Sequence, residues 1–132
     1  MAGVLLDTDV VSYLFRNDPA AKRYAQHLRG RIWTISFMTL AEIEHGMIHR
    51  RWGRAKRQRM EEHLTLFAVC WPDPDLCRLW AWVRETRERK GRPISTNDAW
   101  IAATALRLDL SLVTNNPEDF QGITGLKVIS EG

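Results

Sequence analysis

Four acidic side chains lie at or near the ends of predicted strands and the starts of predicted helices. Asp7 follows the apolar run Val4-Leu5-Leu6, and Glu42 lies one turn into a segment with helical spacing. Asp98 stands at the start of a late helical segment, and Asp119 follows the run Leu-Ser-Leu-Val-Thr in the loop Asn-Asn-Pro-Glu-Asp-Phe. A carboxylate directly after a buried strand is costly unless it is paired or bound to a metal ion. The four positions are therefore candidates for a shared site.

The elements that would position them alternate along the chain. Strands are predicted at 4–6, 32–35, 68–71, 110–113 and 127–129. Helices are predicted after Asp9, which would be the N-cap of the first, over 19–29, from Thr39, over 54–66, from Leu76 to Gly91, and from a cap at Asn97 or Asp98. This alternation predicts an α/β fold with a central, mainly parallel sheet that helices cover on both faces. In such sheets sites form at the carboxyl ends of the strands.

Each acid also has a purely structural explanation. Thr39 to Glu42 matches the capping-box pattern, in which Glu42 would only satisfy the start of its helix. Asp98 would be an N-cap in competition with Ser95, Thr96 and Asn97, and Asp119 a turn residue. Asp7 is the hardest to explain in this way, and the joint pattern favours function more than any single position does.

Length, charge and composition limit the class of protein. The 132 residues predict one domain, and 45% apolar with 27% charged residues is typical of globular chains. No apolar run approaches the ~18 residues of a membrane span, and the N-terminus lacks a secretory pattern, so we expect a cytoplasmic protein without membrane attachment. Residues 84–92 hold five basic and two acidic side chains, and residues 50–59 hold six basic and no acidic ones: Arg50, Arg51, Arg54, Lys56, Arg57 and Arg59. One such run fits a solvated helix face equally well, but two in a chain of net positive charge favour a polyanionic partner.

Four blocks of the sequence resemble the PIN-domain family, and within it the ribonuclease toxins of VapBC toxin–antitoxin pairs. The blocks are LLDTDVVSYL, ISFMTLAEIEHGM, TNDAWIAATALRLDLSLVTNNPEDF and GLKVI. Their most specific parts are S-x-x-T-x-x-E-x-x-x-G at 36–46 and D-x-x-I-A-A at 98–103. They span nearly the whole chain, 1–132, and leave the basic stretch between 50 and 92 unmatched.

The resemblance implies a metal-dependent endoribonuclease. Asp7, Glu42 and Asp98 match the family's most regular acids, which would hold Mg²⁺ or Mn²⁺ and activate water. Thr8, Thr114 and Asn115 would orient the carboxylates. The resemblance also implies an RNA substrate, a small antitoxin protein as partner, and a homodimer.

One position departs from the frequent family pattern. Where that pattern places an Asp two residues after the Thr of the last block, this chain has Asn116. We favour Asp119 as the fourth acid, with Asn116 as a neutral ligand or water holder, and expect Glu118 to face solvent.

Two other functions compete with the nuclease. One is a nucleic-acid-binding module with the same fold and no turnover, which the basic composition supports and the intact acidic set disfavours. The other is a zinc hydrolase built on Glu42, His45 and His49, which share a helix face but lack the H-E-x-x-H spacing.

Overall fold

A computed structural model describes residues 2–132, which form an α/β fold with a central sheet between layers of helices. Its five strands all run parallel in the order β3-β2-β1-β4-β5. The elements are, in chain order, β1 (Gly3–Leu6), α1 (Thr8–Arg16), α2 (Pro19–Leu28), β2 (Ile32–Ser36), α3 (Phe37–His49), α4 (Arg54–Leu64), β3 (Ala68–Cys70), α5 (Pro74–Arg89), α6 (Thr96–Leu108), β4 (Ser111–Val113), the 3-10 helix η1 (Pro117–Phe120) and β5 (Val128–Ile129). The predicted fold class is confirmed.

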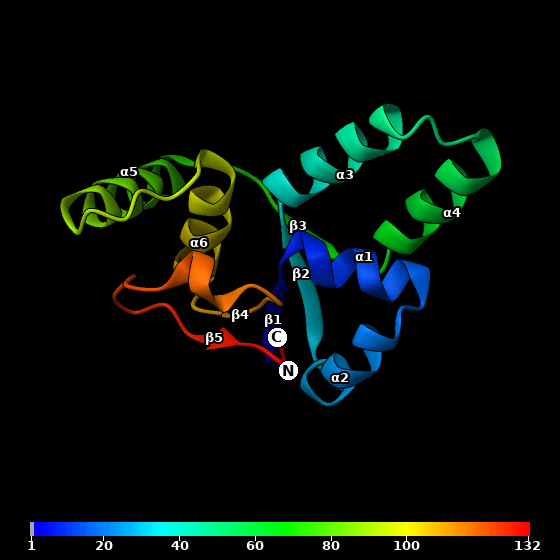
Figure 1. Cartoon of the computed structure of the whole chain (residues 1–132), viewed down its shortest axis with the longest axis horizontal. Coiled ribbons are helices and arrows are strands. Elements are labelled where there is room, and N and C mark those ends of the chain that lie inside the picture. Colours follow the sequence, from blue (N-terminus) through cyan, green and yellow to red (C-terminus); the bar gives the residue numbers. More distant parts are fainter. Residues whose placement is uncertain (1) are drawn as a thin grey trace.

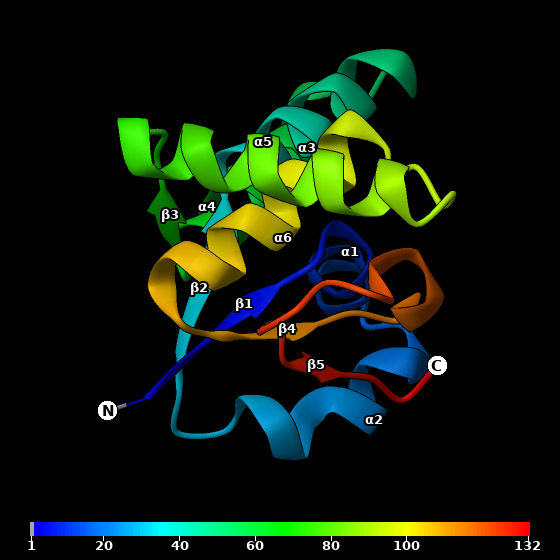
Figure 2. The same ribbon diagram turned by 90° about the vertical axis from the view of Figure 1, so that its left-hand side faces the viewer.

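Helices cover both faces of the sheet because the central strand is apolar on both sides. Val4 and Leu6 of β1 belong to the core beneath α1, α2, α3 and α4, whereas Leu5 belongs to the core beneath α6. Figure 1 shows α1 and α2 on one side of the sheet and α6 on the other, with α3 and α4 folded as an arm that extends beyond the sheet. Seen from the side, α5 lies across α6 (Figure 2), against which it packs.

The strand register brings the candidate acids to one edge. Leu5 pairs with Thr34 on β2, and Leu6 pairs with Val113 on β4. The residues that follow these strands, Asp7 and Thr114 among them, therefore leave the sheet at the same carboxyl edge, as the switch-point rule requires. The starts of α1, α3 and α6 meet there.

Four helix starts differ from the sequence prediction. The helix α5 begins at Pro74 and not at Leu76, because Asp73 caps it by accepting from Leu76 N. Asp7 rather than Asp9 is the N-cap of α1, and its side chain accepts from Thr8 N. Ser36 caps α3 by accepting from Met38 N, so that helix begins at Phe37 and not at Thr39. Ser95 caps α6 through Asp98 N, so neither Asn97 nor Asp98 is the cap. In each case a hydroxyl or carboxylate just before the expected residue satisfies the free backbone N–H.

No helix among residues 2–132 combines the length and the apolar content that crossing a bilayer requires.

Candidate metal centre

Asp7 lies at the centre of the carboxyl edge and is almost fully buried. Its Oδ1 accepts from Thr8 N at 2.8 Å, and its Oδ2 accepts from the Thr114 hydroxyl at 2.7 Å. Burial and, to a smaller extent, the nearby charge of Asp9 together raise the pKa of Asp7 to about 7, against two hydrogen bonds that favour the ionised form. Asp7 is thus held ready to ionise near neutral pH.

Asp9 is a fifth acid of this site, which the sequence prediction missed by treating it as a helix cap. From the first turn of α1 its Oδ2 accepts from Asn115 N at 3.1 Å and from Asn116 Nδ2 at 2.8 Å. Burial raises the pKa of Asp9, and the charge of Asp119 adds to that rise. The sequence does hold a signal for Asp9, because Asp7 and Asp9 stand two residues apart directly after a buried strand.

Glu42 does not complete a capping box. Its Oε1 accepts from the Thr8 hydroxyl at 2.8 Å, and Thr39 Oγ1 lies 3.0 Å from the same hydroxyl. Asn97 Nδ2 of α6 approaches Glu42 Oε2 at 3.5 Å. The carboxylate of Glu42 is therefore directed from α3 towards the starts of α1 and α6, where the other acids lie, and Thr8 holds it there.

Asp98 stands in the first turn of α6, half-buried. Burial raises its pKa, and the charges of Asp119, Glu42 and Asp9 raise it further in that order. These electrostatic links place Asp98 within reach of acids from α1, α3 and η1. Asp98 is not the N-cap of α6, because Ser95 provides the cap.

Asp119 is exposed on η1, and the buried Phe120 anchors the turn that carries it. The carbonyl of Asp119 accepts from Arg87 Nη1 at 2.9 Å, while Arg87 Nε donates to the carbonyl of Arg92 at 2.7 Å. Arg87 is only 5% exposed and ties η1 to the α5–α6 connection. Glu118 is also exposed and lines the same cavity as Asp98 and Asp119.

The two asparagines after β4 act on the site differently. Asn116 donates to Asp9, and its backbone N–H donates to Thr114 Oγ1 at 3.1 Å. The side chain of Asn115 turns instead to the tyrosines: its Oδ1 accepts from Tyr24 Oη at 2.6 Å, and its Nδ2 donates to Tyr13 Oη at 3.3 Å. Asn115 therefore orients Asp9 through its backbone N–H and not through its side chain.

No cation among the described residues pairs with the acids of this site. Within residues 2–132, no Lys, Arg or His side chain forms a salt bridge with Asp7, Asp9, Glu42, Asp98 or Asp119. Nor do three or more His, Cys, Asp or Glu side chains of this part of the chain converge closely enough to enclose one ion, and this includes the set of Glu42, His45 and His49. The acids at this edge are nevertheless hard oxygen donors without a counter-charge, which is the type of ligand that a divalent cation prefers.

A family model for the PIN domain matches residues 4–126. The chain belongs to the PIN-domain family. It is 34% identical over 125 residues to a protein of Haemophilus influenzae strain R2866 named ribonuclease VapC1, with 93% of each chain covered. It is 28% identical to a Shigella flexneri protein named tRNA(fMet)-specific endonuclease VapC, with 96% of each covered.

Solved structures agree with this assignment. The structure of VapBC-1 from nontypeable Haemophilus influenzae has a chain 32% identical to this PIN domain, with a TM-score of 0.82 and 96% of each chain covered. VapBC2 from Rickettsia felis, bound to a DNA fragment of its promoter, superposes with a TM-score of 0.86 over 98% of each chain at 23% identity, which speaks for the fold. The resemblance seen in the sequence blocks is confirmed.

The stability of this PIN domain is expected to fall as the pH rises from about 4 to about 7 without divalent metal. Folded Asp7 holds its proton up to about pH 7, whereas the unfolded carboxyl loses it near its ordinary value of 3.8. Unfolding then releases a proton in this window, so the free energy of unfolding drops with pH, by up to ~4 kcal/mol from this group alone.

Urea unfolding in EDTA between pH 4.5 and 8 measures this slope. The Asp7→Asn variant is expected to flatten it, with the remainder due to Asp9 and Asp98, whose pKa values are raised in the same direction. A wild-type profile that is level across this range, or an Asp7→Asn profile as steep as wild type, would contradict the raised pKa.

The basic side chains of residues 50–59 differ in their surroundings. Arg50 extends along α3 into a pocket beside Glu42, and Lys56 Nζ lies 4.2 Å above the centre of the Trp52 ring. Lys56 and Arg59 line a neighbouring surface hollow. Arg54 and Arg57 line another shallow surface of α4 together with Glu61.

Proposed function

We propose that this PIN domain is the endoribonuclease toxin of a type II toxin–antitoxin pair, which hydrolyses RNA phosphodiester bonds with Mg²⁺, or Mn²⁺ in its place. The observation that carries the proposal is the meeting of five carboxylates from α1, α3, α6 and η1 at one sheet edge, three of them with raised pKa values. The names of the relatives, ribonuclease VapC1 and tRNA(fMet)-specific endonuclease VapC, support RNA as the substrate.

Asp7, Glu42, Asp98 and Asp119 would hold the metal, and Asp9 joins them from the structure. A bound divalent ion lowers the pKa of a coordinated water and neutralises charge on the leaving oxygen. The chain's own contribution is orientation: Thr114 fixes Asp7, Thr8 fixes Glu42, and Asn116 fixes Asp9. Such supporting hydrogen bonds hold the direction of the carboxylates and favour their ionised form.

Cleavage and binding must be measured separately to test the proposal. Purified protein is incubated with labelled transfer and messenger RNA in Mg²⁺ or in EDTA, and products are resolved on a denaturing gel. Discrete products in Mg²⁺ and none in EDTA are expected. Binding that survives in both conditions without any product would favour the alternative, a nucleic-acid-binding PIN module without turnover.

A protein partner and self-association complete the proposal. The solved structures of VapBC complexes from Haemophilus influenzae and Rickettsia felis support a small antitoxin as the partner that neutralises this chain. We further propose that the chain forms a homodimer and acts in the cytoplasm, without membrane attachment. A small protein encoded next to this one that co-purifies with it and blocks cleavage is the expected finding.

Asp119, and not Asn116, is expected to act as the fourth acid. Asp119→Asn should raise the Mg²⁺ concentration for half-maximal cleavage several-fold and lower the rate at saturating Mg²⁺, because a carboxylate within range of Asp9 and Asp98 is lost. Asn116→Asp should instead lower stability in EDTA, because it puts a second carboxylate where Asn116 Nδ2 lies 2.8 Å from Asp9. Metal titrations of both variants decide this, and an Asp119→Asn titration like that of wild type would remove Asp119 from the metal site.

Arg54 and Arg57 of the basic run are expected to bind the RNA backbone at a distance from the bond that is hydrolysed. Affinity for a long RNA should fall steeply with salt, and changing Arg54 and Arg57 to Gln should flatten the logarithmic slope by about 0.7 for each lost single-strand phosphate contact. Binding isotherms at salt concentrations from about 50 to about 200 mM measure this slope. An unchanged slope would mean that α4 presents a solvated face or contacts the partner protein.

A further inference from the structure

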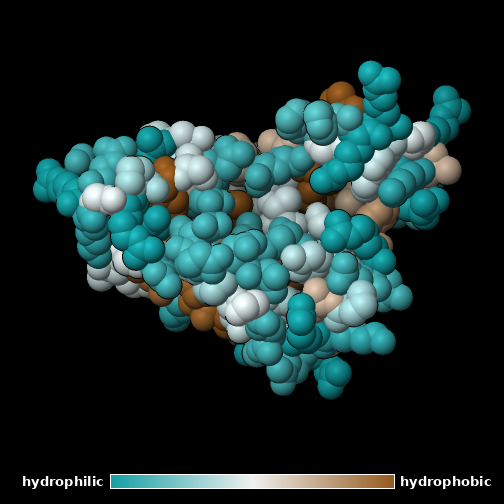
Figure 3. All heavy atoms as spheres, in the orientation of Figure 1, coloured by the Kyte–Doolittle hydropathy of each residue, from teal (hydrophilic) through white to brown (hydrophobic). Residues whose placement is uncertain are grey.

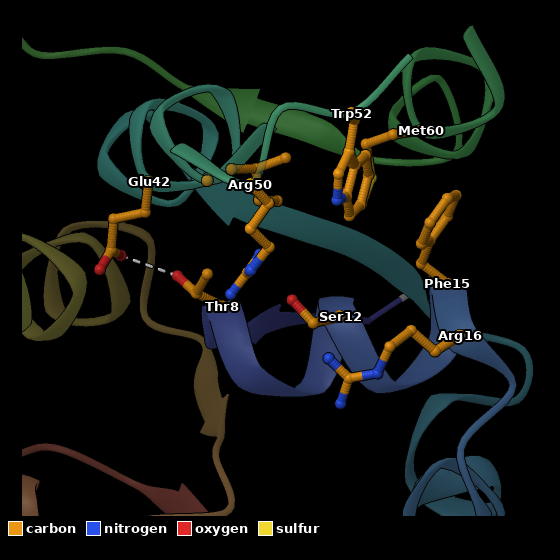
Figure 4. A pocket seen from close by; sticks show the side chains of 10 residues that line it. Thr8, Ser12, Phe15, Arg16, Glu42, Arg50, Trp52 and Met60 are labelled. Atoms are coloured by element: carbon orange, nitrogen blue, oxygen red, sulfur yellow. Dashed lines mark hydrogen bonds between the residues drawn. The ribbon is translucent and has the colours of Figure 1, made fainter. Parts of the chain in front are cut away.

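A pocket of about 220 Å³ opens directly beside the acidic site, between α1 and the segment that joins α3 to α4. Thr8 and Glu42, which belong to the site, line one end of it, and their hydrogen bond is visible in Figure 4. Whatever occupies the pocket therefore lies next to the carboxylates. The volume is below the roughly 300–1,000 Å³ of pockets that enclose a whole small ligand, so it suits one part of a larger one.

Two guanidinium groups reach this pocket. Arg50 points from the end of α3 towards Thr8 and Ser12, whereas Arg16 runs back along α1 past Ser12 (Figure 4), and both line the pocket. Arg50 has no ion-pair partner within residues 2–132. Arg16 lies 3.6 Å from Asp18 and over the ring of Tyr13, with 5.6 Å between its Cζ and the ring centre. Arg50 is thus free for an anionic group, and Arg16 would exchange a long ion pair for one.

Gly46 makes room for the guanidinium of Arg50. A Cβ at position 46 would lie 3.1 Å from Arg50 Nη1, which is closer than ordinary van der Waals contact. The absent side chain lets Arg50 lie along α3 towards Glu42 and Thr8. This gives Gly46, which belongs to the motif S-x-x-T-x-x-E-x-x-x-G, a physical role in shaping the pocket.

The far end of the pocket is apolar. Phe15 and Trp52 stack there with ring centres 5.6 Å apart, and Met60 lies beside them. In the space-filling view, hydrophobic atoms appear in the recess between the α3–α4 arm and α1, within hydrophilic surroundings (Figure 3). A cationic entrance beside an apolar wall suits a phosphate that carries a sugar and a base.

We propose that this pocket binds the backbone phosphate of the nucleotide adjacent to the bond that is cut, through Arg50 and Arg16. The inference rests on the proposed ribonuclease function and adds to it a subsite that fixes the register of the RNA strand against the carboxylates. A phosphate between two guanidiniums forms charge-assisted, often bidentate hydrogen bonds. The apolar wall formed by Phe15 and Trp52 faces the sugar and base of that nucleotide.

The test compares Arg50→Gln and Arg16→Gln with the control Arg23→Gln. Arg23 is exposed on α2 and has no side-chain hydrogen bond or ion pair within residues 2–132, so the control removes the same charge from a neutral position. A short fluorescent single-stranded RNA is used, with binding measured in EDTA and single-turnover cleavage in Mg²⁺. Arg50→Gln is expected to raise the half-saturating RNA concentration about tenfold, as loss of one charged hydrogen bond implies. The rate at saturating RNA should fall much less, and the salt slope should drop by about 0.7.

Gly46→Ala provides the second variant. It is expected to weaken RNA binding in the same direction, because the new methyl group displaces Arg50. The double variant Gly46→Ala with Arg50→Gln should bind no more weakly than Arg50→Gln alone, since both changes act on one contact. Additive losses would show that Gly46 acts elsewhere.

The outcomes separate this inference from the function on which it rests. If wild type cleaves RNA and both arginine variants bind and cleave like Arg23→Gln, the subsite is wrong while the nuclease stands. The subsite is also wrong if Arg50→Gln keeps full RNA affinity and loses only inhibition by the partner protein, because the pocket then receives a protein segment. If wild type binds the short RNA but never cleaves it, the nuclease proposal fails, and the binding arm still decides the subsite.

Discussion

Asp98→Asn is expected to reduce RNA cleavage at saturating Mg²⁺ at least ~100-fold while the protein stays folded. Asp98 is half-buried, and the charges of Asp119, Glu42 and Asp9 all raise its pKa. Removing its charge takes a ligand from the proposed metal site and also relieves repulsion in the metal-free protein. The thermal midpoint in EDTA should therefore stay level or rise, and Asp7→Asn is expected to lose cleavage in the same way.

Asp75→Asn is the matched control for this change. Asp75 lies in the first turn of α5, its side chain is 66% exposed, and its partner is the exposed Arg78. Surface pairs of this kind contribute little, so the control should cleave at the wild-type rate with stability changed by less than ~1 kcal/mol. Cleavage by Asp98→Asn at the rate of this control, at matched Mg²⁺, would exclude Asp98 from the mechanism.

Arg87→Met is expected to lower the free energy of unfolding by about 3 kcal/mol. The guanidinium of Arg87 is buried and donates to the carbonyls of Asp119 and Arg92. Methionine fills much of the same space but removes both hydrogen bonds, and a hydrogen bond from a charged group contributes about 1.5–3 kcal/mol. Urea unfolding at pH 7 measures the loss.

The same variant should also raise the Mg²⁺ requirement, because the turn that carries Asp119 loses its tie to α5. Arg89→Met is the control: its partner Glu85 and Arg89 itself are both largely exposed, so a change of less than ~1 kcal/mol is expected. Equal stability of the two variants would contradict the structural role of Arg87. A large stability loss with an unchanged Mg²⁺ requirement would show that Asp119 needs no support from α5.

Much of the fold follows from local sequence patterns. The apolar run Val4–Leu6, the helical stripes and the alternation of elements predict the parallel sheet, and the acid that follows a buried strand indicates its functional edge. The exact helix starts do not follow, because several hydroxyls and carboxylates near each start compete to be the cap. The caps are Ser36 and Ser95 rather than Thr39 and Asn97, because their hydroxyls accept from Met38 N and Asp98 N.

Two parts of the site depend on distant contacts. The local sequence indicates that Asp9 is a helix cap. Its contacts come from Asn115 and Asn116 in the loop after β4, which are 106 and 107 residues away in sequence. Arg87 lies in a basic stretch that resembles a solvated helix face, yet its partner Asp119 is 32 residues away. In the same way, the run of residues 50–59 does not reveal that Arg50 turns towards Glu42 while Arg54 stays outside.

Titration calorimetry of Mg²⁺ and Mn²⁺ into the metal-free protein tests the central claim most directly, because it needs neither the correct RNA nor turnover. Wild type is expected to bind saturably with release of protons between pH 6 and 7.5, since Asp7 has a pKa of about 7 and must ionise. Asp98→Asn should bind at least about tenfold more weakly, and Asp75→Asn like wild type. No saturable binding by wild type, or equal binding by Asp98→Asn, would contradict a divalent-metal centre at this edge of the sheet.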